Sequence, residues 1–356
     1  MAQTLDIDNL TLQPDEAMSA SEAVFELVFN SPELNRIHTV ASGVERDKRI
    51  PIFGLMPVLG KCLTGCSTSA SAKQIPTSEK LWTPKLIGDK LEHCDSDLDS
   101  LFKVFKRSKK ANELNDITDT EEAAFILGRT EEALNQMLWR YIDFGDTAME
   151  TTDDGGVLKV SEYFGVENFN CIDGKWKQLI AIATNNTAKY VTISENAGVN
   201  YAAQMTLAAD AALKVFRAMY NGADSRMFGQ DGLHFEVTRS LFNNWVDFRE
   251  DKGFLHTVNA DEAASVGQAN YRGIPIVVRD DWDRGIKQFF DNGTKYDKPH
   301  RAVLIANGNQ PVGLLDEESL AELKSWYSMD DDVFRIKFAV KMDVKILQDE
   351  LVMVAY

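Results

Sequence analysis

Segment 333–347 constrains the fold more than any other part of the chain, because apolar residues occupy every second position in it. These residues are Phe334, Ile336, Phe338, Val340, Met342, Val344 and Ile346. Side chains alternate between the two faces of a β-strand, so the pattern predicts one long strand with a continuous apolar face. At about 3.3 Å per residue, such a strand would span roughly 50 Å.

A face of that length needs an equally long element to cover it, and the strongest helical pattern of the chain supplies one. Thr118 and Glu121 form a capping box, and apolar residues recur at helical spacing through Ile142 towards Met149. The turn cluster Asp153–Gly156 closes the pattern. A helix of roughly thirty residues would be about 45 Å long. We therefore expect an α+β fold in which this helix packs along the long strand.

Shorter elements are expected around this pair. The sequence predicts helices over 19–29 and about 200–220, a short helix capped by Ser240, strands over 233–237 and 302–306, an edge strand after the turn at 271–273, and a hairpin between 333–347 and 351–355. Segment 44–82 is rich in Gly, Ser, Thr and Pro and is too long for an ordinary connection. It is either a projecting loop or a two-stranded excursion.

The chain is acidic, with a formal net charge of -17, and 44% of its residues are hydrophobic. The hydrophobic share is enough for a core, while the acidity argues against tight non-specific binding to nucleic acid, which needs Lys and Arg to displace phosphate counterions. Residues 1–33 include no Lys or Arg and so lack the basic region of a signal peptide. No apolar run is long enough to cross a bilayer. We expect a soluble protein made in a cytoplasm, with no membrane partner.

No motif predicts catalysis, a cofactor or a metal site. Gly60-Lys61-Cys62 imitates a phosphate-binding loop, but Cys62 stands where the Mg²⁺-binding Ser or Thr belongs. Four possible metal ligands are too loosely spaced for a tetrahedral site, namely Cys62, Cys66, His93 and Cys94. The acidic groups at 280–283 and 330–332 are expected to be solvated turns, with a weak divalent-cation contact as the alternative.

Four segments carry a resemblance to a known family. They are the helix over 132–156 with its acidic, Gly-rich end, the Gly-x-Pro strand entry at 271–277, the strand end at 304–307 before a Gly-rich loop, and the terminal pair 333–347 and 351–355. Their order resembles that of tailed-phage major capsid proteins with the Hong Kong 97 type fold. The resemblance covers nearly the whole chain from Arg46 onward.

The resemblance implies a division of the chain into five parts. They are an N-terminal arm (1–45), an extended loop (46–85), a peripheral domain with a long spine helix on a long thin β-sheet (86–156), an axial domain (157–328) and return strands of the peripheral domain (329–356). The stretch ahead of the loop is short, which implies that scaffolding is a separate protein or absent.

The function implied by the resemblance is structural. The chain would be a major capsid protein that self-assembles into pentamers and hexamers of an icosahedral shell, enclosing double-stranded DNA without sequence-specific binding. Its partners would be other copies of itself, a portal, and separate scaffolding or decoration proteins. It would reside in the virion capsid and be assembled in the bacterial host cytoplasm, with no cofactor, no metal and no enzymatic activity.

The basic residues of the long strand are candidates for contacts between copies. Arg335, Lys337, Lys341 and Lys345 oppose the overall charge of the chain. They are either an ordinary solvent face with edge-protecting lysines or a surface that binds the acidic arm of a neighbouring copy. The acidic candidates are Asp6, Asp8, Asp15 and Glu16.

Two other functions stay open at this point. An encapsulin-like compartment would share the fold and would package a protein cargo in place of DNA. An enzyme unrelated to either would need a pocket in 200–307 where His and carboxylate side chains converge.

Overall fold

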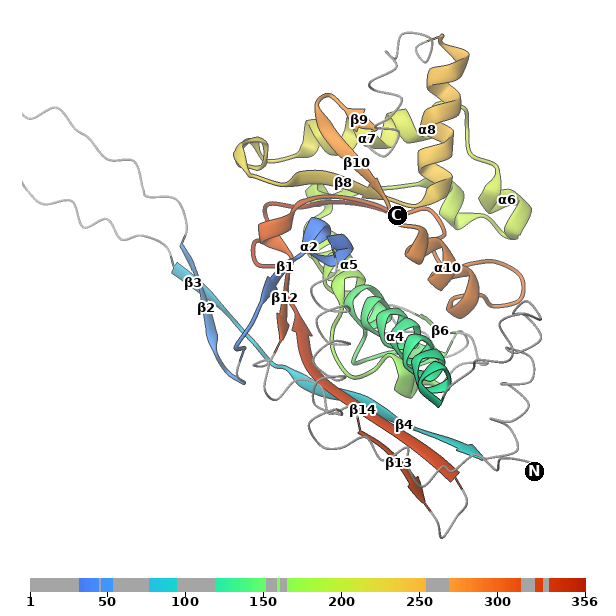
Figure 1. Ribbon diagram of the computed structural model, residues 1–356. Helices are drawn as coiled ribbons and strands as arrows, with labels where there is room; N and C mark the ends of the chain where they lie inside the picture. The colour runs from blue at the N-terminus through green and yellow to red at the C-terminus, as the bar shows by residue number, and fades with distance from the viewer. Residues whose placement is uncertain are drawn as a thin grey trace, which may run out of the picture.

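The computed structural model describes residues 32–44, 46–53, 77–94, 119–151, 159–160, 165–253, 269–314, 324–328 and 333–356. Two larger β-sheets and two short ribbons make up the strands of these parts. Figure 1 shows the two larger sheets one above the other, with the C-terminus in the upper part. Several predicted features lie outside the described residues: the helix over 19–29, the turn at 153–156, the acidic group at 330–332, and Cys62 and Cys66.

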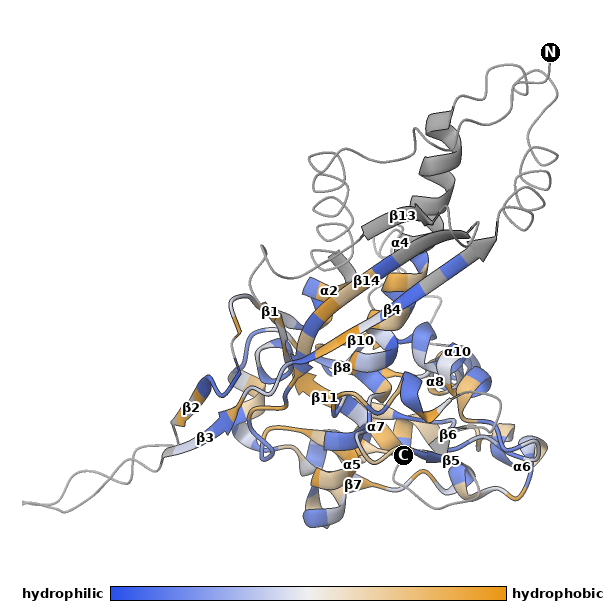
Figure 2. Ribbon diagram, turned by 90° about the horizontal axis from the view of Figure 1, so that it is seen from below, coloured by the Kyte–Doolittle hydropathy of each residue, from blue (hydrophilic) through white to orange (hydrophobic). Residues whose placement is uncertain are grey.

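The first sheet, here called the long sheet, is built around β14 (Val333–Val344). Its strands are β1 (Thr39–Ala41), β12 (Pro311–Leu314), β14, β13 (Lys324–Ser328) and β4 (Lys85–Cys94). The antiparallel ladder between β14 and β4 runs from Val333 opposite Cys94 to Met342 opposite Lys85. Figure 2 shows β14 and β4 running together beyond the main body of the molecule. This pair forms the elongated part of the fold.

The predicted packing of the long helix on the long strand is confirmed. Helix α4 (Asp119–Phe144) contributes Leu138, Tyr141 and Ile142 to a buried cluster that also holds Val340 and Val344 of β14. Leu138 and Ile142 are completely buried. The apolar stripe of the helix and the period-two face of the strand therefore bury each other, as their sequence patterns require.

The long strand ends three residues earlier than predicted, at Val344 in place of Leu347. The reason is the Gln178 side chain, whose Nε2 donates to the Val344 carbonyl (2.9 Å) and whose Oε1 accepts from the Ile346 amide (2.9 Å). On one edge a side chain thus takes the place of a strand partner, while on the other edge the Lys345 and Leu347 amides still donate to backbone carbonyls, and Ile346 stays buried.

The second sheet has six strands and is covered on both faces. In order across the sheet they are β7 (Tyr190–Val191), β15 (Met353–Ala355), β11 (Ala302–Ala306), β8 (Leu233–Val237), β10 (Ile274–Val278) and β9 (Asn270–Tyr271). All of β11 is buried, as predicted. Val303 and Ile305 point into one core cluster and Ala302 and Leu304 into another, which explains its uninterrupted apolar sequence.

Four helices cover the faces of the six-stranded sheet. Helices α5 (Lys175–Asn185) and α10 (Asp280–Phe289) contribute Trp176 and Trp282 to the first cluster. Helices α7 (Ala211–Gly222) and α8 (Arg239–Asp251) contribute Phe216 and Leu241 to the second. Among the described residues, the remaining helical elements are α2 (Pro32–Ile37), α6 (Tyr201–Met205) and the 3₁₀ turns Val166–Asn168, Thr187–Lys189, Ser194–Ala197, Ser225–Gly229 and Asn307–Asn309.

Several sequence predictions about this sheet are wrong. Segment 351–355 does not form a hairpin with the long strand, because β15 pairs with β11 and β7 and so buries both of its apolar faces. The helix predicted over 200–220 is two helices, α6 and α7, separated at 206–210. Strand β10 is not at the edge, since β9 pairs with it. The cap of α8 is Thr238 and not Ser240.

The described part of segment 44–82 forms a two-stranded ribbon, which confirms the second of the two expected alternatives for those residues. Strands β2 (Arg49–Phe53) and β3 (Thr77–Leu81) are antiparallel. At the base of the ribbon, Trp82 is buried against Gly313, where an added Cβ would come within 2.6 Å of the indole. A further small ribbon joins β5 (Glu150–Thr151) to β6 (Lys159–Val160). No helix among the described residues is long and apolar enough to span a membrane.

Candidate functional site

The structure places the predicted basic contact residues on the long sheet. Arg335, Lys337 and Lys341 belong to β14, and Lys345 follows its end. Lys337 is exposed and Lys341 half-buried. The predicted acidic partners, Asp6, Asp8, Asp15 and Glu16, lie outside the described residues. The contact between the two groups therefore stays a prediction.

The strand register adds two lysines that the sequence analysis missed. Lys337 lies opposite Lys90 of β4 on one side and opposite Lys324 of β13 on the other. Lys90 also contacts Glu92 at 2.7 Å. Like charges directly opposite each other destabilise a sheet. The register thus aligns Lys324, Lys337 and Lys90, here called the lysine row, across three neighbouring strands.

The ammonium of Lys345 is bound within the subunit. Its Nζ lies 3.1 Å from Asp343 Oδ2 and 3.3 Å from Thr83 Oγ1. Asp343 is buried and also accepts a hydrogen bond from the Thr83 amide (2.7 Å). Lys345 therefore joins the base of the ribbon to the long sheet.

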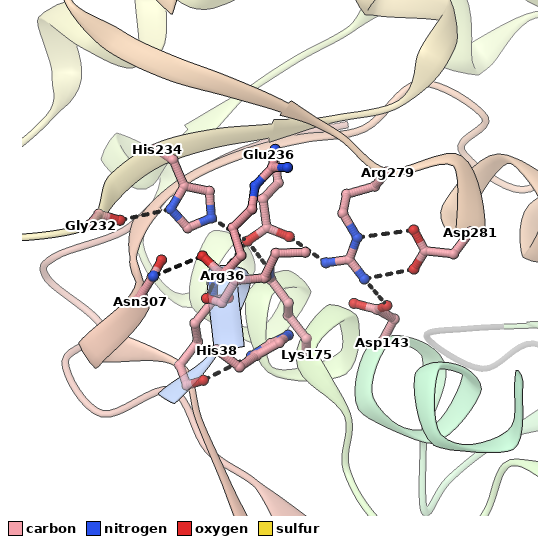
Figure 3. Close-up of polar contacts among 12 residues, drawn as sticks. Arg36, His38, Asp143, Lys175, Gly232, His234, Glu236, Arg279, Asp281 and Asn307 are labelled. Carbon is pink, nitrogen blue, oxygen red and sulfur yellow. Dashed lines mark hydrogen bonds and ion pairs between the residues drawn. The ribbon is translucent and has the colours of Figure 1, made fainter. Parts of the chain in front are cut away.

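A buried junction of charged side chains lies between the long sheet and the six-stranded sheet (Figure 3). Its centre is Arg279, at the start of α10. The Arg279 guanidinium donates to Glu236 (2.6 Å), to Asp143 (2.5 Å) and to Asp281 (2.6 Å). It also lies over the Trp139 ring, 4.6 Å from the centroid. One side chain thus connects α4, β8 and α10.

Glu236 extends this junction towards the other elements. Its Oε1 accepts from Lys175 Nζ (2.5 Å) and from Gln310 Nε2 (2.9 Å). His234 Nε2 lies 3.1 Å from the same oxygen, while His234 Nδ1 faces the Gly232 carbonyl at 2.8 Å. Both ring nitrogens of His234 therefore lie within hydrogen-bond distance of an oxygen.

The surroundings of each carboxyl decide its protonation. Burial raises the pKa of Asp143 to about 7, against the opposing effect of Arg279. Burial would also raise the pKa of Glu236, but Lys175, His234 and Arg279 together hold it well below its usual value. Glu236 therefore stays ionised, and Asp143 is the carboxyl of the junction whose charge changes near neutral pH.

The pH dependence of unfolding should separate Asp143 from its neighbours. Because the folded pKa of Asp143 is above the unfolded value of 3.8, its contribution is fully present below pH 3.8 and is lost as pH rises through about 7. We expect wild type to lose stability relative to Asp143→Asn over this range, by at most about 1.4 kcal/mol per pH unit. His38, whose pKa burial lowers to about 3, has the opposite trend and cancels because both proteins contain it. Denaturation midpoints measured at several pH values would check this; parallel curves would contradict it.

A cleft of about 530 Å³ opens beside the junction, between α2, α4, β10 and α10. Arg36, Trp139 and Arg284 are among its lining residues, and its lining, all within the described residues, includes no His, Cys, Ser or Thr. The carboxylate of Asp281 is already paired with Arg279. The lining of the cleft thus offers no hydroxyl or thiol nucleophile and no histidine base for the enzyme alternative. In the part of the chain that the structure describes, no group of three or more His, Cys, Asp or Glu is placed to hold a metal.

No sequence pattern predicted the junction, and the prediction of solvated turns at 280–283 is wrong. Those residues form the first turn of α10 and are not solvated turns: Asp281 pairs with buried Arg279, and Asp283 accepts from the Arg239 amide at 2.6 Å. One signal was available. Glu236 stands between apolar residues in a strand that is buried on both faces, where an acid needs a partner.

Comparisons with known proteins find the fold but no sequence relative. No protein-family model matches the chain, and no curated protein matches it. A Mycobacterium phage Ogopogo structure matches with a TM-score of 0.50 and 13% identity, over 90% of each chain. A satellite phage P4 procapsid that includes the size determination (Sid) protein gives a TM-score of 0.48 and 10% identity, over 95% of this chain and 96% of that one. The capsid of a native GTA particle gives a TM-score of 0.47 and 10% identity, over 100% of this chain and 94% of that one.

The match at a TM-score of 0.50 extends over nine tenths of both chains. A likeness of that extent at 13% identity is a statement about the fold and not about individual residues. The chain has the α+β fold found in phage capsid structures.

Proposed function

We propose that this chain is the major capsid protein of a tailed bacterial virus. Copies of it assemble into pentamers and hexamers of an icosahedral shell that encloses double-stranded DNA. The observation that carries the proposal is the pair α4 and β14: a helix of 26 residues and a strand of 12 bury each other outside a sheet that already has its own core. A compact enzyme has no need of such an extension, whereas a shell subunit that contacts many neighbouring copies does.

The net charge of the chain supports a shell that does not bind the enclosed DNA tightly. A net charge of -17 disfavours the counterion release on which non-specific DNA affinity depends. The proposed role requires no catalytic residue and no cofactor. Its partners are other copies of the chain, a portal, and separate scaffolding or decoration proteins. Its place is the virion capsid, after synthesis in the host cytoplasm.

Sedimentation of the purified protein tests the proposed function. We expect fast-sedimenting particles of one size that protect DNA from nuclease when they are isolated from infected cells. Particles that hold a protein cargo and no DNA would contradict the viral role.

We also propose that the basic face of β14 binds the acidic arm of a neighbouring copy. Lys337 is exposed in the lysine row, and Lys341 lies further along the same face of β14. The residue opposite Lys341 on β4 is Leu86, which is 59% exposed. Many weak contacts of this kind let a closed shell correct its errors and still be stable as a whole.

The double variant Lys337→Glu/Lys341→Glu tests this contact. It should raise the protein concentration needed for assembly by roughly tenfold or more, because attraction becomes repulsion at every copy. Light scattering measures assembly, and circular dichroism checks that the subunit stays folded. The matched control Lys252→Glu/Lys287→Glu adds the same charge at exposed positions, one directly after α8 and one in α10, and should assemble normally. Equal assembly of the two double variants would refute the contact.

A further inference from the structure

The turn between α10 and β11 holds an asparagine followed by a glycine at its exposed tip. Asp291 and Tyr296 form an antiparallel bridge across it, and we call it the Asn292 turn. Asn292 and Gly293 are both exposed, and Gly293 has a φ of 80°, which glycine adopts without strain. An added Cβ on Gly293 would meet no other atom within 4 Å. The peptide between Asn292 and Gly293 is therefore open to solvent.

The side-chain oxygen of Asn292 is held by two backbone amides. Asn292 Oδ1 accepts from the Thr294 amide (3.0 Å) and from the Lys295 amide (2.8 Å). Two such donors draw electron density away from the Asn292 Cγ carbon. They also stabilise the negative charge that the oxygen would carry if a nucleophile attacked Cγ, as the donors of an oxyanion hole do in acyl transfer. The carboxamide of Asn292 is therefore activated as an electrophile.

The backbone nitrogen of Gly293 has a base within reach. It donates to Asp291 Oδ1 at 2.9 Å, a distance that suits general-base catalysis. The same oxygen accepts from the Tyr201 hydroxyl at 2.5 Å, which fixes the carboxylate in place. The N–H bond lies in the plane of the peptide, so it can stay bound to Asp291 while a carbon approaches the nitrogen from above that plane. Base, electrophile and nucleophile thus belong to three consecutive residues.

The chain has two other Asn-Gly pairs, and their surroundings oppose the same reaction. Asn221 and Gly222 belong to α7, whose helical backbone resists the rotation that would bring the glycine nitrogen against the asparagine Cγ. Asn307 Nδ2 donates to the Arg36 carbonyl at 2.8 Å, which restrains the nitrogen that would have to leave. These two pairs serve as internal controls for Asn292.

We propose that the Asn292 turn promotes the deamidation of Asn292 in the folded subunit. The Gly293 nitrogen bonds to Asn292 Cγ while its proton passes to Asp291. The side-chain oxygen carries the negative charge between its two amide donors until the bond from Cγ to the side-chain nitrogen breaks. That nitrogen leaves as ammonia with the proton that Asp291 returns, and a cyclic succinimide remains. Water then opens the ring to aspartate or isoaspartate, so water is the only co-reactant.

The products change both the charge and the main chain of the turn. Each adds a carboxylate beside Asp291, and isoaspartate also lengthens the main chain by one methylene group. The turn contacts α6, because the Thr294 carbonyl accepts from the Tyr201 amide (3.2 Å) and the Tyr296 amide donates to Gln204 Oε1 (2.9 Å). A longer main chain would displace these contacts. The modified fraction therefore increases with the age of the protein, and the reaction takes place within one subunit whether or not copies assemble.

Ageing of the purified full-length protein tests this proposal. Samples are kept at neutral pH for several weeks and digested with trypsin, and mass spectrometry follows peptide 288–295. This peptide should gain about 1 Da and separate into an aspartate and an isoaspartate species. The peptides that contain Asn221 and Asn307 come from the same digest and should stay unmodified. In guanidinium chloride, the reaction at Asn292 should slow by roughly tenfold or more, because unfolding removes the base and the oxyanion donors.

The variant Asp291→Asn separates the base from the intrinsic reactivity of an Asn-Gly pair. Its amide oxygen can still accept from Gly293 and Tyr201 but is a far weaker base, so deamidation of Asn292 should slow by roughly tenfold or more. The control Asp247→Asn removes the same charge at an exposed position of α8 and should leave the rate unchanged. Circular dichroism checks that both variants are folded. Equal rates at Asn292 in folded wild type, denatured wild type and Asp291→Asn, or no gain of mass at all, would overturn the proposal.

Discussion

The Arg279→Met variant is expected to lose about 3–5 kcal/mol of unfolding free energy, because it removes the cation from a buried group of charges. Asp143, Glu236 and Asp281 all accept from this guanidinium, and the Arg279 side chain is only 2% exposed. Without it, Lys175 is the remaining buried cation beside Glu236. The three carboxyls would then bind protons or become hydrated, and both changes would weaken the contact between α4 and α10.

Denaturant titration of the unassembled subunit measures this loss. The matched control is Arg284→Met, which removes an exposed arginine from the same helix and should change the unfolding free energy by less than about 0.5 kcal/mol. The deficit of Arg279→Met should be smaller at pH 5 than at pH 8, since acid neutralises the abandoned carboxyls. Equal midpoints for the two variants would show that the junction does not hold the elements together.

The Leu138→Ala variant is expected to lose about 3–5 kcal/mol of unfolding free energy, because it leaves a cavity between α4 and β14. Leu138 is completely buried in the cluster with Val340 and Met342, and it stands near the C-terminal end of α4. The same denaturant titration measures the effect. Gln136→Ala is the control, because Gln136 is exposed on the same helix and its truncation should be nearly neutral. A neutral Leu138→Ala would mean that the helix and the strand do not depend on each other.

The long pair was predictable because its signal lies within two continuous segments. Period-two alternation in 333–347 and helical spacing up to Ile142 each specify an apolar face, and two faces of similar length cover one another. The end of the strand was not predictable, because it depends on Gln178, a residue far away in the sequence. Strand β15 was misplaced for a similar reason: its pattern shows that it is buried, but not which strand it pairs with.

The buried junction could not be predicted from the sequence, because its members come from separate segments. Asp143, Lys175, Glu236 and Arg279 have no common spacing, and only the fold brings them within hydrogen-bond distance. The basic face of β14 was easier, since its residues share one strand. Even there, the register with β4 and β13 added Lys90 and Lys324, which no local pattern indicates.

Negative-stain electron microscopy of the purified full-length protein, alone and together with the proteins encoded beside it, tests the central claim most directly. The proposed function predicts closed polyhedral shells of uniform size, or rings of five and six copies. A small oligomer of one size under all conditions would contradict it.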